Sequence, residues 1–200
     1  LYDNVFNLKQ FLSGRTFWIG NTEVSKYYPM ANYNCAFEII DSLESFKDLF
    51  YLLMIGAGVG VRVLKEDVQS IPKIRTDYKL IHKDYTPIDP ENRMENTSLK
   101  FISEEEVEII VGDSKEGWVQ YLEFFFNQLS GHDYRKVKTI IIDYSNVRKK
   151  GEMLRTFGGT ASGHDSFKQM FIKIDRVIQK KAISLNHKKV KLEPIDCMDI

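Results

Sequence analysis

Cysteine and histidine are both scarce in this chain of 200 residues. The two cysteines, Cys35 and Cys197, are too few for a secreted disulfide framework and fit a reducing compartment such as the cytoplasm. The four histidines lack the spacing of metal ligands, so the sequence does not predict a zinc or iron site. They are His82, His132, His164 and His187.

Net charge is absent as well, because 28 basic side chains balance 28 acidic ones. The densest basic run, Arg148-Lys149-Lys150, is followed at once by Gly151 and Glu152, which is typical of a solvated turn. Since a nucleic acid backbone requires clustered Lys and Arg, we expect no direct nucleic acid binding. The longest charge-free apolar run, between Asp48 and Arg62, is too short to span a bilayer, so no membrane partner is expected.

Neither end of the sequence has the features of a domain boundary. The first residues, Leu1-Tyr2-Asp3, include no initiator Met and no basic and apolar leader. We therefore expect no signal peptide, and a start inside a longer chain. The last residues, 192–200, indicate a helix that stops after one turn, so a fragment of a larger protein is expected.

What the sequence does contain is an alternation of strand and helix patterns, with 43% hydrophobic residues to supply the core of one domain. The expected strands are residues 34–40, 59–64, 107–111 and 140–143. The expected helices follow Asp41-Ser42, Asp113-Ser114 and the stretch 157–163. Such alternation predicts an α/β fold with a mostly parallel sheet. Residues 65–100 lack sustained periodicity, so we expect an irregular excursion within a single domain, 1–200.

Two glycine-rich stretches lie next to predicted helices. Phe157-Gly158-Gly159-Thr160-Ala161-Ser162-Gly163 precedes a helix, with His164 beside it, and indicates either a site for phosphate or other polar oxygens or a plain connection. Gly56-Ala57-Gly58-Val59-Gly60 follows a helix and precedes a strand, the reverse of a dinucleotide-binding fingerprint. It therefore favours a helix-to-strand turn. No Lys-Ser or Lys-Thr follows a glycine loop, so a P-loop is not predicted.

Single residues leave two interpretations open. Cys35, at the start of a predicted strand, is either a small buried hydrophobe or a catalytic thiol. Asp113 and Asp143 follow or end strands, where acids in α/β folds can face a ligand, yet a helix cap or a turn explains each equally well.

Six blocks considered together resemble the adenosylcobalamin-dependent (class II) ribonucleoside-triphosphate reductases, nearly end to end. The blocks are Ser13-Gly14-Arg15-Thr16-Phe17-Trp18-Ile19-Gly20-Asn21-Thr22, Asn34-Cys35, Gly56 to Gly60, Gly112-Asp113-Ser114-Lys115-Glu116-Gly117-Trp118, Asp143-Tyr144-Ser145-Asn146-Val147-Arg148 and Phe157 to Gly163. The segment 194–200 resembles the one that leads into a further helix and an effector loop.

The resemblance implies a ten-stranded α/β barrel made of two five-stranded halves, with this chain holding most of the first half. It implies adenosylcobalamin as cofactor, a thiyl radical that removes hydrogen from C3′ of a ribonucleotide, and two cysteines that reduce C2′. Cys35 matches the first of these reducing cysteines. The resulting disulfide is reset by an external dithiol such as thioredoxin.

The resemblance also implies binding residues. Thr16, Asn34 and Gly58 match positions that line the substrate pocket, and a glycine there lets a ribose rest on bare backbone. Asp41, Ser42 and Leu43 resemble the stretch that holds a deoxynucleotide effector. Some monomeric reductases carry an insertion after the Cys35 strand that mimics a dimer partner, and we expect this chain to lack it.

The resemblance stops short of a complete enzyme. Cys197 does not match a catalytic position, and neither the radical cysteine nor the second reducing cysteine lies in these residues. We therefore expect the chain to need the remaining part of the barrel, in the same protein or as a separate chain. The alternatives are a noncatalytic nucleotide-binding module and a scaffold remnant with an open sheet edge.

Overall fold

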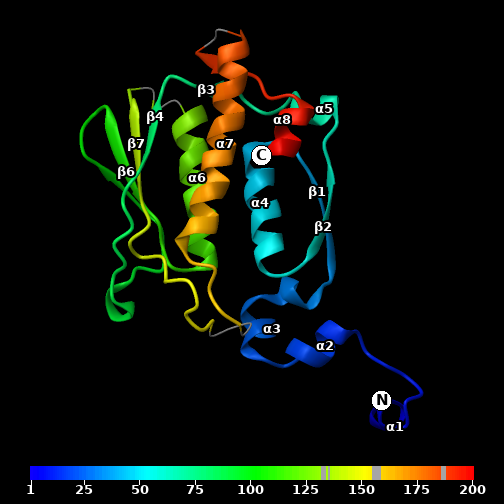
Figure 1. Ribbon diagram of the computed structural model, residues 1–200. Helices are drawn as coiled ribbons and strands as arrows, with labels where there is room; N and C mark the ends of the chain where they lie inside the picture. The colour runs from blue at the N-terminus through cyan, green and yellow to red at the C-terminus, as the bar shows by residue number, and fades with distance from the viewer. Residues whose placement is uncertain (132–133, 135, 155–158, 186–187) are drawn as a thin grey trace.

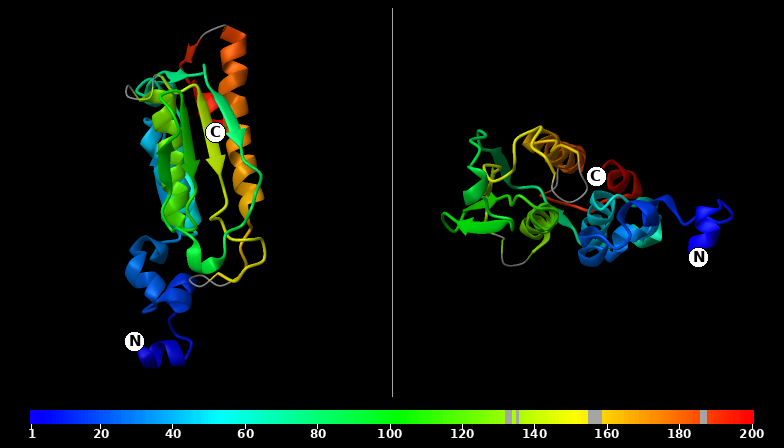
Figure 2. Two further views of the ribbon diagram at one scale, coloured as in Figure 1. Left: turned by 90° about the vertical axis from the view of Figure 1, so that its left-hand side faces the viewer. Right: turned by 90° about the horizontal axis from the view of Figure 1, so that it is seen from below.

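The computed structural model describes the whole chain except residues 132–133, 135, 155–158 and 186–187. The described residues form one four-stranded sheet and two two-stranded sheets. Figure 1 shows a layer of long helices between the larger sheet and one of the smaller ones. A segment of short helices at the N-terminus extends below these layers, as Figure 2 shows from a second side. The α/β class predicted from the sequence is therefore observed.

The N-terminal segment contains four short helical elements with a small core of their own. They are α1 (Tyr2–Phe6), α2 (Gly14–Ile19), α3 (Glu23–Tyr27) and the 3-10 helix η1 (Pro29–Asn32). Ile19, Val24 and Ala31 are buried together with Ile55, which follows a later helix. This second core therefore fixes the N-terminal segment to the main body of the molecule.

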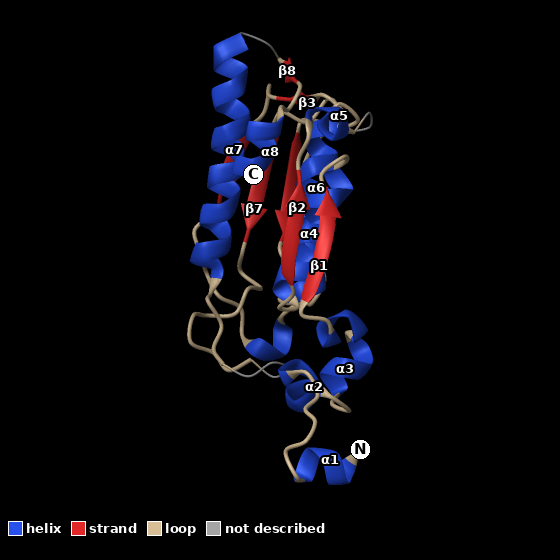
Figure 3. Cartoon of the chain, turned by 90° about the vertical axis from the view of Figure 1, so that its right-hand side faces the viewer, coloured by secondary structure: helices blue, strands red, loops and turns tan. Residues whose placement is uncertain are grey.

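The first strand and helix form as predicted. Strand β1 (Cys35–Ile39) is followed by α4 (Leu43–Met54) and then by β2 (Gly58–Arg62), which pairs with β1 in parallel. The hydroxyl of Ser42 accepts a hydrogen bond from the Ser45 amide at 3.2 Å and caps the helix. Figure 3 shows β1 and β2 side by side, with α4 packed against them.

Residues 65–100 contain more structure than the sequence predicts. They form α5 (Lys65–Val68), β3 (Ile74–Arg75), β4 (Lys79–His82), η2 (Pro90–Asn92) and β5 (Ser98–Phe101). Strand β4 joins the main sheet in parallel with a strand that lies about sixty residues later in the chain. Such short strands carry too few side chains to show a period, so only pairing with distant partners defines them.

The main sheet has the strand order β4-β7-β6-β5, and β5 alone is antiparallel to its neighbour. The remaining elements are β6 (Glu106–Ile110), α6 (Lys115–Ser130), β7 (Thr139–Asp143), α7 (His164–Leu185), β8 (Lys189–Val190) and α8 (Pro194–Asp199). Strands β6 and β7, with α6 between them, confirm the predicted second strand–helix unit.

Helices α6 and α7 lie between the main sheet and α4, and aromatic side chains fill this layer. Tyr121 and Phe125 of α6 are fully buried and contact Phe171 of α7. On the other side, Phe46 of α4 packs against Phe126 of α6, with ring centroids 5.6 Å apart. Because one continuous core joins α4 to α6 and α7, the parts of the chain before and after residue 65 form one packed body.

Candidate functional site

Three of the four predicted substrate-site residues meet at the start of the β1–β2 pair. Cys35 is the first residue of β1, it is exposed, and it lies opposite Gly58 in the register of the two strands. The Gly58 amide donates a hydrogen bond to the Asn34 carbonyl at 2.8 Å. An accessible thiol therefore lies beside backbone that carries no side chain, and Cys35 is not the small buried hydrophobe that was the other interpretation.

The glycine turn before β2 is a helix-to-strand turn, as predicted. It follows α4 and ends in β2, so it lacks the strand-to-helix order of a dinucleotide fingerprint. Gly56 has φ of +85°, in the left-handed region that favours glycine. The turn therefore directs the chain back along β1 and brings Gly58 next to Asn34.

Thr16 lies on α2, at the N-terminal side of this strand pair. Its hydroxyl is 2.8 Å from that of Ser13, whose side chain caps the same helix. The preceding residue, Arg15, donates hydrogen bonds to the carbonyl of Ala31, which precedes β1, at 3.1 Å and to that of Gly56, which precedes β2, at 2.7 Å. Arg15 thus links the helix that carries Thr16 to the glycine turn.

The predicted effector residues lie at the opposite end of β1. A strand rises roughly 3.3 Å per residue, so the five residues of β1 separate Asp41 from Cys35 by about 20 Å. Asp41 accepts a hydrogen bond from the Ser45 hydroxyl at 3.0 Å, and Ser42 caps α4. Leu43 packs against the main core. These contacts give Asp41, Ser42 and Leu43 a structural role. The length of β1 separates the three residues from the substrate-site residues.

A cavity of about 920 Å³ lies where the N-terminal segment meets the main body, within the usual size range of ligand pockets. Sequence patterns did not reveal it. Its walls include Arg15 and Gly56 from the β1–β2 side, and Arg93, Asp113 and Arg148 from loops next to the main sheet. The cavity therefore borders the glycine turn that leads to Gly58.

The second glycine-rich stretch forms part of this cavity wall. Ala161, Ser162 and Gly163 line the cavity just before α7, while Phe157 and Gly158 lie outside the described residues. Gly163 has φ of +77°, and a β-carbon there would come within 2.9 Å of the Lys150 amide nitrogen. The described part of the stretch therefore packs closely against the loop after β7.

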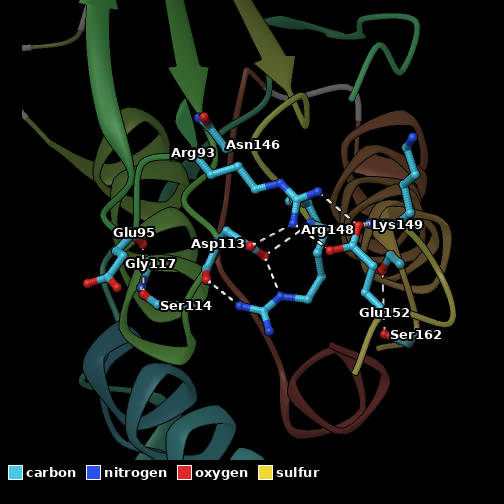
Figure 4. A network of polar contacts seen from close by, with 12 residues as sticks. Arg93, Glu95, Asp113, Ser114, Gly117, Asn146, Arg148, Lys149, Glu152 and Ser162 are labelled. Carbon is cyan, nitrogen blue, oxygen red and sulfur yellow. Dashed lines mark hydrogen bonds and ion pairs between the residues drawn. The ribbon is translucent and has the colours of Figure 1, made fainter. Parts of the chain in front are cut away.

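Ion pairs hold together the loops at the cavity (Figure 4). The guanidinium of Arg93, only 7% exposed, binds both carboxylate oxygens of Glu152, at 2.7 and 2.8 Å, and lies 3.5 Å from Asp113. Asp113 also accepts hydrogen bonds from the Arg148 backbone and side chain, at 3.0 and 2.9 Å. Arg148 is thus part of a partly buried network, whereas its sequence context favours a solvated turn.

This network makes the stability of the protein sensitive to acid. The guanidinium of Arg93 lowers the pKa of the Glu152 carboxyl from its ordinary value of 4.5 to about 2. A carboxyl with a lowered pKa stabilises the folded state above its unfolded pKa, and this stabilisation is lost as the pH falls toward the folded pKa. We expect the free energy of unfolding to fall between about pH 4.5 and about pH 2, and Glu152→Gln to flatten this part of the profile.

Urea unfolding across this pH range would test the prediction. Glu104→Gln is a matched control, because Glu104 also pairs with a cation, Lys136, but both side chains are more than 70% exposed. The control should keep the pH profile of the unchanged chain. Equal profiles for the unchanged chain and for the Glu152→Gln variant would contradict the assigned role.

The other chemically active residues have structural partners. Asp143 forms an ion pair with Lys83 at 2.6 Å, and the ring of His164 stacks on Tyr85 at 3.7 Å between centroids. Cys197 is 5% exposed, and burial raises the pKa of its thiol to about 11.

The described residues contain no group of three His, Cys, Asp or Glu arranged for a metal ion. In the described part of the chain, no helix has the length and apolar character needed to cross a membrane.

A family model and a solved structure show which class of protein this fold resembles. Residues 88–178 match the family model described as "B12-dependent ribonucleotide reductase, insertion domain". The fold is similar to the crystal structure of a B12-dependent (class II) ribonucleotide reductase, with a TM-score of 0.78 and 22% sequence identity. That likeness covers 98% of this chain and 30% of the reductase chain. The fold is therefore that of one part of a class II reductase.

The sequences of curated relatives show which kind of class II reductase the chain resembles. The chain is 27% identical, over its whole length, to the adenosylcobalamin-dependent ribonucleoside-triphosphate reductase of Lactobacillus gasseri and 26% identical to that of Lactobacillus leichmannii. A probable enzyme of the same name from Dictyostelium discoideum is 27% identical over 90% of the chain. The chain spans 30% of the length of the two Lactobacillus relatives and 23% of the third. The resemblance to adenosylcobalamin-dependent ribonucleoside-triphosphate reductases, predicted from sequence motifs, is confirmed.

The match to an insertion domain corrects one expectation. From the sequence we expect the chain to lack the insertion that some monomeric reductases carry after the Cys35 strand, yet residues 88–178 match a model of an insertion domain. Helix α4 follows β1 directly. The matching residues begin later, at residue 88, and include β5, β6, α6, β7 and most of α7. The matched region continues the alternation of strands and helices, so the sequence pattern does not set it apart. Its helix α6 packs against α4.

Proposed function

We propose that this chain is the part of a ribonucleotide reductase that carries the substrate-facing strand pair and one reducing thiol. The observation that carries the proposal is the exposed Cys35 thiol, placed opposite Gly58 and next to Asn34. A ribose lying on the Gly58 backbone would have this thiol within reach, because no β-carbon separates the two. The similarity to ribonucleoside-triphosphate reductases supports a ribonucleoside triphosphate as the substrate.

The proposed reaction uses Cys35 as one of two thiols. Cys35 and a second cysteine, supplied by the remaining part of the reductase, are oxidised to a disulfide and give up two electrons and two protons. The ribose C2′–OH bond is replaced by C2′–H, and the hydroxyl leaves as water, so atoms and electrons balance. An external dithiol of the thioredoxin type then reduces the disulfide by exchange. This cycle requires a reducing compartment, which supports the prediction of a cytoplasmic location.

We include adenosylcobalamin as the cofactor because the names of the similar reductases include it. The described residues do not themselves fit this bulky cofactor. In the first cavity, the charged groups Arg93, Asp113, Arg148 and Glu152 are already paired with one another and lie beside aromatic and aliphatic side chains. A second cavity, of about 560 Å³, is lined almost wholly by apolar side chains, most of them from α4, β2, α7 and α8. We therefore assign the cofactor to the remaining part of the reductase.

The proposal includes a deoxynucleotide effector at Asp41, Ser42 and Leu43. Its support is their resemblance to the effector stretch of reductases and their position at the start of α4, a helix of 12 residues that leads to the glycine turn. An effector bound there would lie at the end of β1 opposite Cys35. Its influence on the substrate site would then have to pass through α4 or β1.

Selective alkylation tests substrate binding by the chain itself. Iodoacetamide should label exposed Cys35 and spare Cys197, which is buried and has a raised pKa. We expect ribonucleoside triphosphate to slow labelling of Cys35 at least about tenfold at saturation, since a bound ribose covers the thiol. Inorganic triphosphate is the control for non-specific binding. Labelling of Cys35 at the same rate at every nucleotide concentration would contradict the proposed substrate site.

Reductase activity tests the rest of the proposal. The chain is mixed with a chain carrying the remaining part of the barrel, adenosylcobalamin and a dithiol, and deoxyribonucleotide is measured. We expect product only when both chains are present. Nucleotide binding without product in any mixture would favour a noncatalytic binding module instead. Absence of both binding and product would favour a scaffold remnant.

A further inference from the structure

The side chain of Arg15 joins three separate segments through backbone carbonyls. Its Nη1 atom donates to the carbonyl of Ala31 at 3.1 Å and to that of Ile55 at 3.5 Å, and Nη2 donates to that of Gly56 at 2.7 Å. Ala31 lies 16 residues from Arg15, and Gly56 lies 41 residues away. These bonds are therefore tertiary contacts between distant parts of the chain.

Each segment leads directly into a residue of the proposed substrate site. Arg15 precedes Thr16 on α2, Ala31 lies three residues before Asn34, and Gly56 lies two residues before Gly58. Two of the three carbonyl acceptors are well fixed, because Ala31 and Ile55 are both 0% exposed in the second core. Arg15 thus connects segments that lie next to all the proposed substrate contacts, and two of its acceptors belong to the second core.

The chemistry of these contacts requires arginine. A guanidinium presents five N–H donors in one plane and can bond several carbonyls at once, whereas a lysine ammonium acts as a compact point charge. Within the described residues, Arg15 forms no ion pair with a carboxylate. The turn is matched to the side chain, because a β-carbon at Gly56 would lie 3.3 Å from Nη1.

We propose that Arg15 is a positioning residue of the substrate site. It holds α2, the segment before β1 and the glycine turn in one arrangement, so that Thr16, the Asn34–Cys35 pair and Gly58 face a single ribonucleoside phosphate. The inference rests on the proposed function for the identity of the ligand. The arrangement of the three segments can be measured independently of any ligand.

The test uses Arg15→Ala and Arg15→Lys in the 200-residue chain, with two readouts. The first is hydrogen exchange of the Gly58 amide, which bonds to the Asn34 carbonyl. We expect exchange to accelerate about tenfold in both variants, because the turn loses its link to α2 and η1. The second is protection of Cys35 from iodoacetamide by ribonucleoside triphosphate, which should require about tenfold more nucleotide. Guanidinium ion at millimolar concentration should partly restore both readouts in Arg15→Ala, and methylammonium should not.

Arg62→Ala is a matched control. Arg62 lies at the other end of β2 and donates two hydrogen bonds to Asp67, at 3.0 and 2.8 Å, so its removal also breaks a multiple guanidinium contact. It should leave the Gly58 amide and the protection of Cys35 unchanged. Amides of β7, in the main sheet, report whether the effect is local, and they should keep their protection in both Arg15 variants.

The outcomes separate this inference from the proposed function. Unchanged exchange at Gly58 in the Arg15 variants would overturn the positioning role, and so would accelerated exchange throughout β7, which indicates a general loss of stability. Faster exchange at Gly58 alone, with guanidinium rescue, supports the role even if nucleotide fails to protect Cys35 in the unchanged chain. That last result would reject the proposed substrate site and leave the arrangement by Arg15 in place.

Discussion

Cys35→Ser is expected to reduce multiple turnover of the completed reductase roughly a thousandfold or more, while nucleotide affinity changes by less than about threefold. Serine keeps the size of the side chain, so an exposed position opposite Gly58 tolerates it and a bound ribose meets nearly the same surface. A hydroxyl cannot form a disulfide, however, and the two electrons for C2′ then have no source in this chain. The loss should therefore appear in turnover and not in binding.

Deoxyribonucleotide formation with an external dithiol would measure the turnover, and calorimetry would measure the affinity. The matched control is Cys197→Ala, which removes the other thiol of the chain from a site that is 5% exposed. It should leave turnover unchanged and lower the free energy of unfolding by about 1 kcal/mol through a small cavity. Sustained turnover by Cys35→Ser would reject Cys35 as a reducing thiol, even if substrate binding near it is confirmed.

The β1–α4–β2 unit could be predicted in detail because each of its signals is local. Ser42 caps α4 through the amide of Ser45, three residues later, and apolar side chains at helical spacing define the helix itself. The glycine turn then ends the helix with a positive φ at Gly56. Interactions within a few residues determine all of these features, so a single sequence contains them.

Other parts of the fold depend on partners that are distant in sequence. Strand β4 has four residues and is defined by pairing with β7, while β5 pairs at the edge of the sheet with β6. Within residues 65–100, polar and charged residues interrupt any apolar pattern around these strands. The sequence consequently indicates an irregular segment where the structure has part of a sheet.

In the candidate site, too, features set by nearby residues could be predicted from the sequence, and contacts between distant residues could not. Cys35 is exposed and lies opposite Gly58, whereas the residue pattern alone left a buried cysteine open; its catalytic role stays a prediction. The pair of Arg93 and Glu152 could not be predicted, because it joins loops 59 residues apart that show no periodicity. The three backbone acceptors of Arg15 are equally invisible in sequence, since any residue type supplies a carbonyl.

Gly117→Ala is expected to lower the free energy of unfolding by about 3 kcal/mol, the largest stability effect that we predict for one added methyl group. A β-carbon on Gly117 would lie 2.3 Å from the carbonyl oxygen of Glu95, and one on Gly112 would lie 2.2 Å from the same atom. The two glycines let the segment before β5 pass directly over the start of α6. Thr97 fixes this approach, because its hydroxyl donates to the Gly117 carbonyl at 2.5 Å and accepts from the Gly112 amide at 2.9 Å.

The neighbouring atoms are backbone on both sides, so the clash cannot be relieved by rotating a side chain. Gly14→Ala is the matched control: Gly14 is also near the start of a helix, α2, but a β-carbon there would meet nothing within 4 Å. Alanine favours helix more than glycine does, so this control should leave stability unchanged or raise it by less than about 1 kcal/mol. Urea unfolding of both variants would measure the difference. Asp113, a member of the ion-pair network, lies between the two close glycines, so Gly117→Ala should also weaken the dependence of the unfolding free energy on acid pH. Equal unfolding free energies for Gly117→Ala and Gly14→Ala would contradict the close approach at α6.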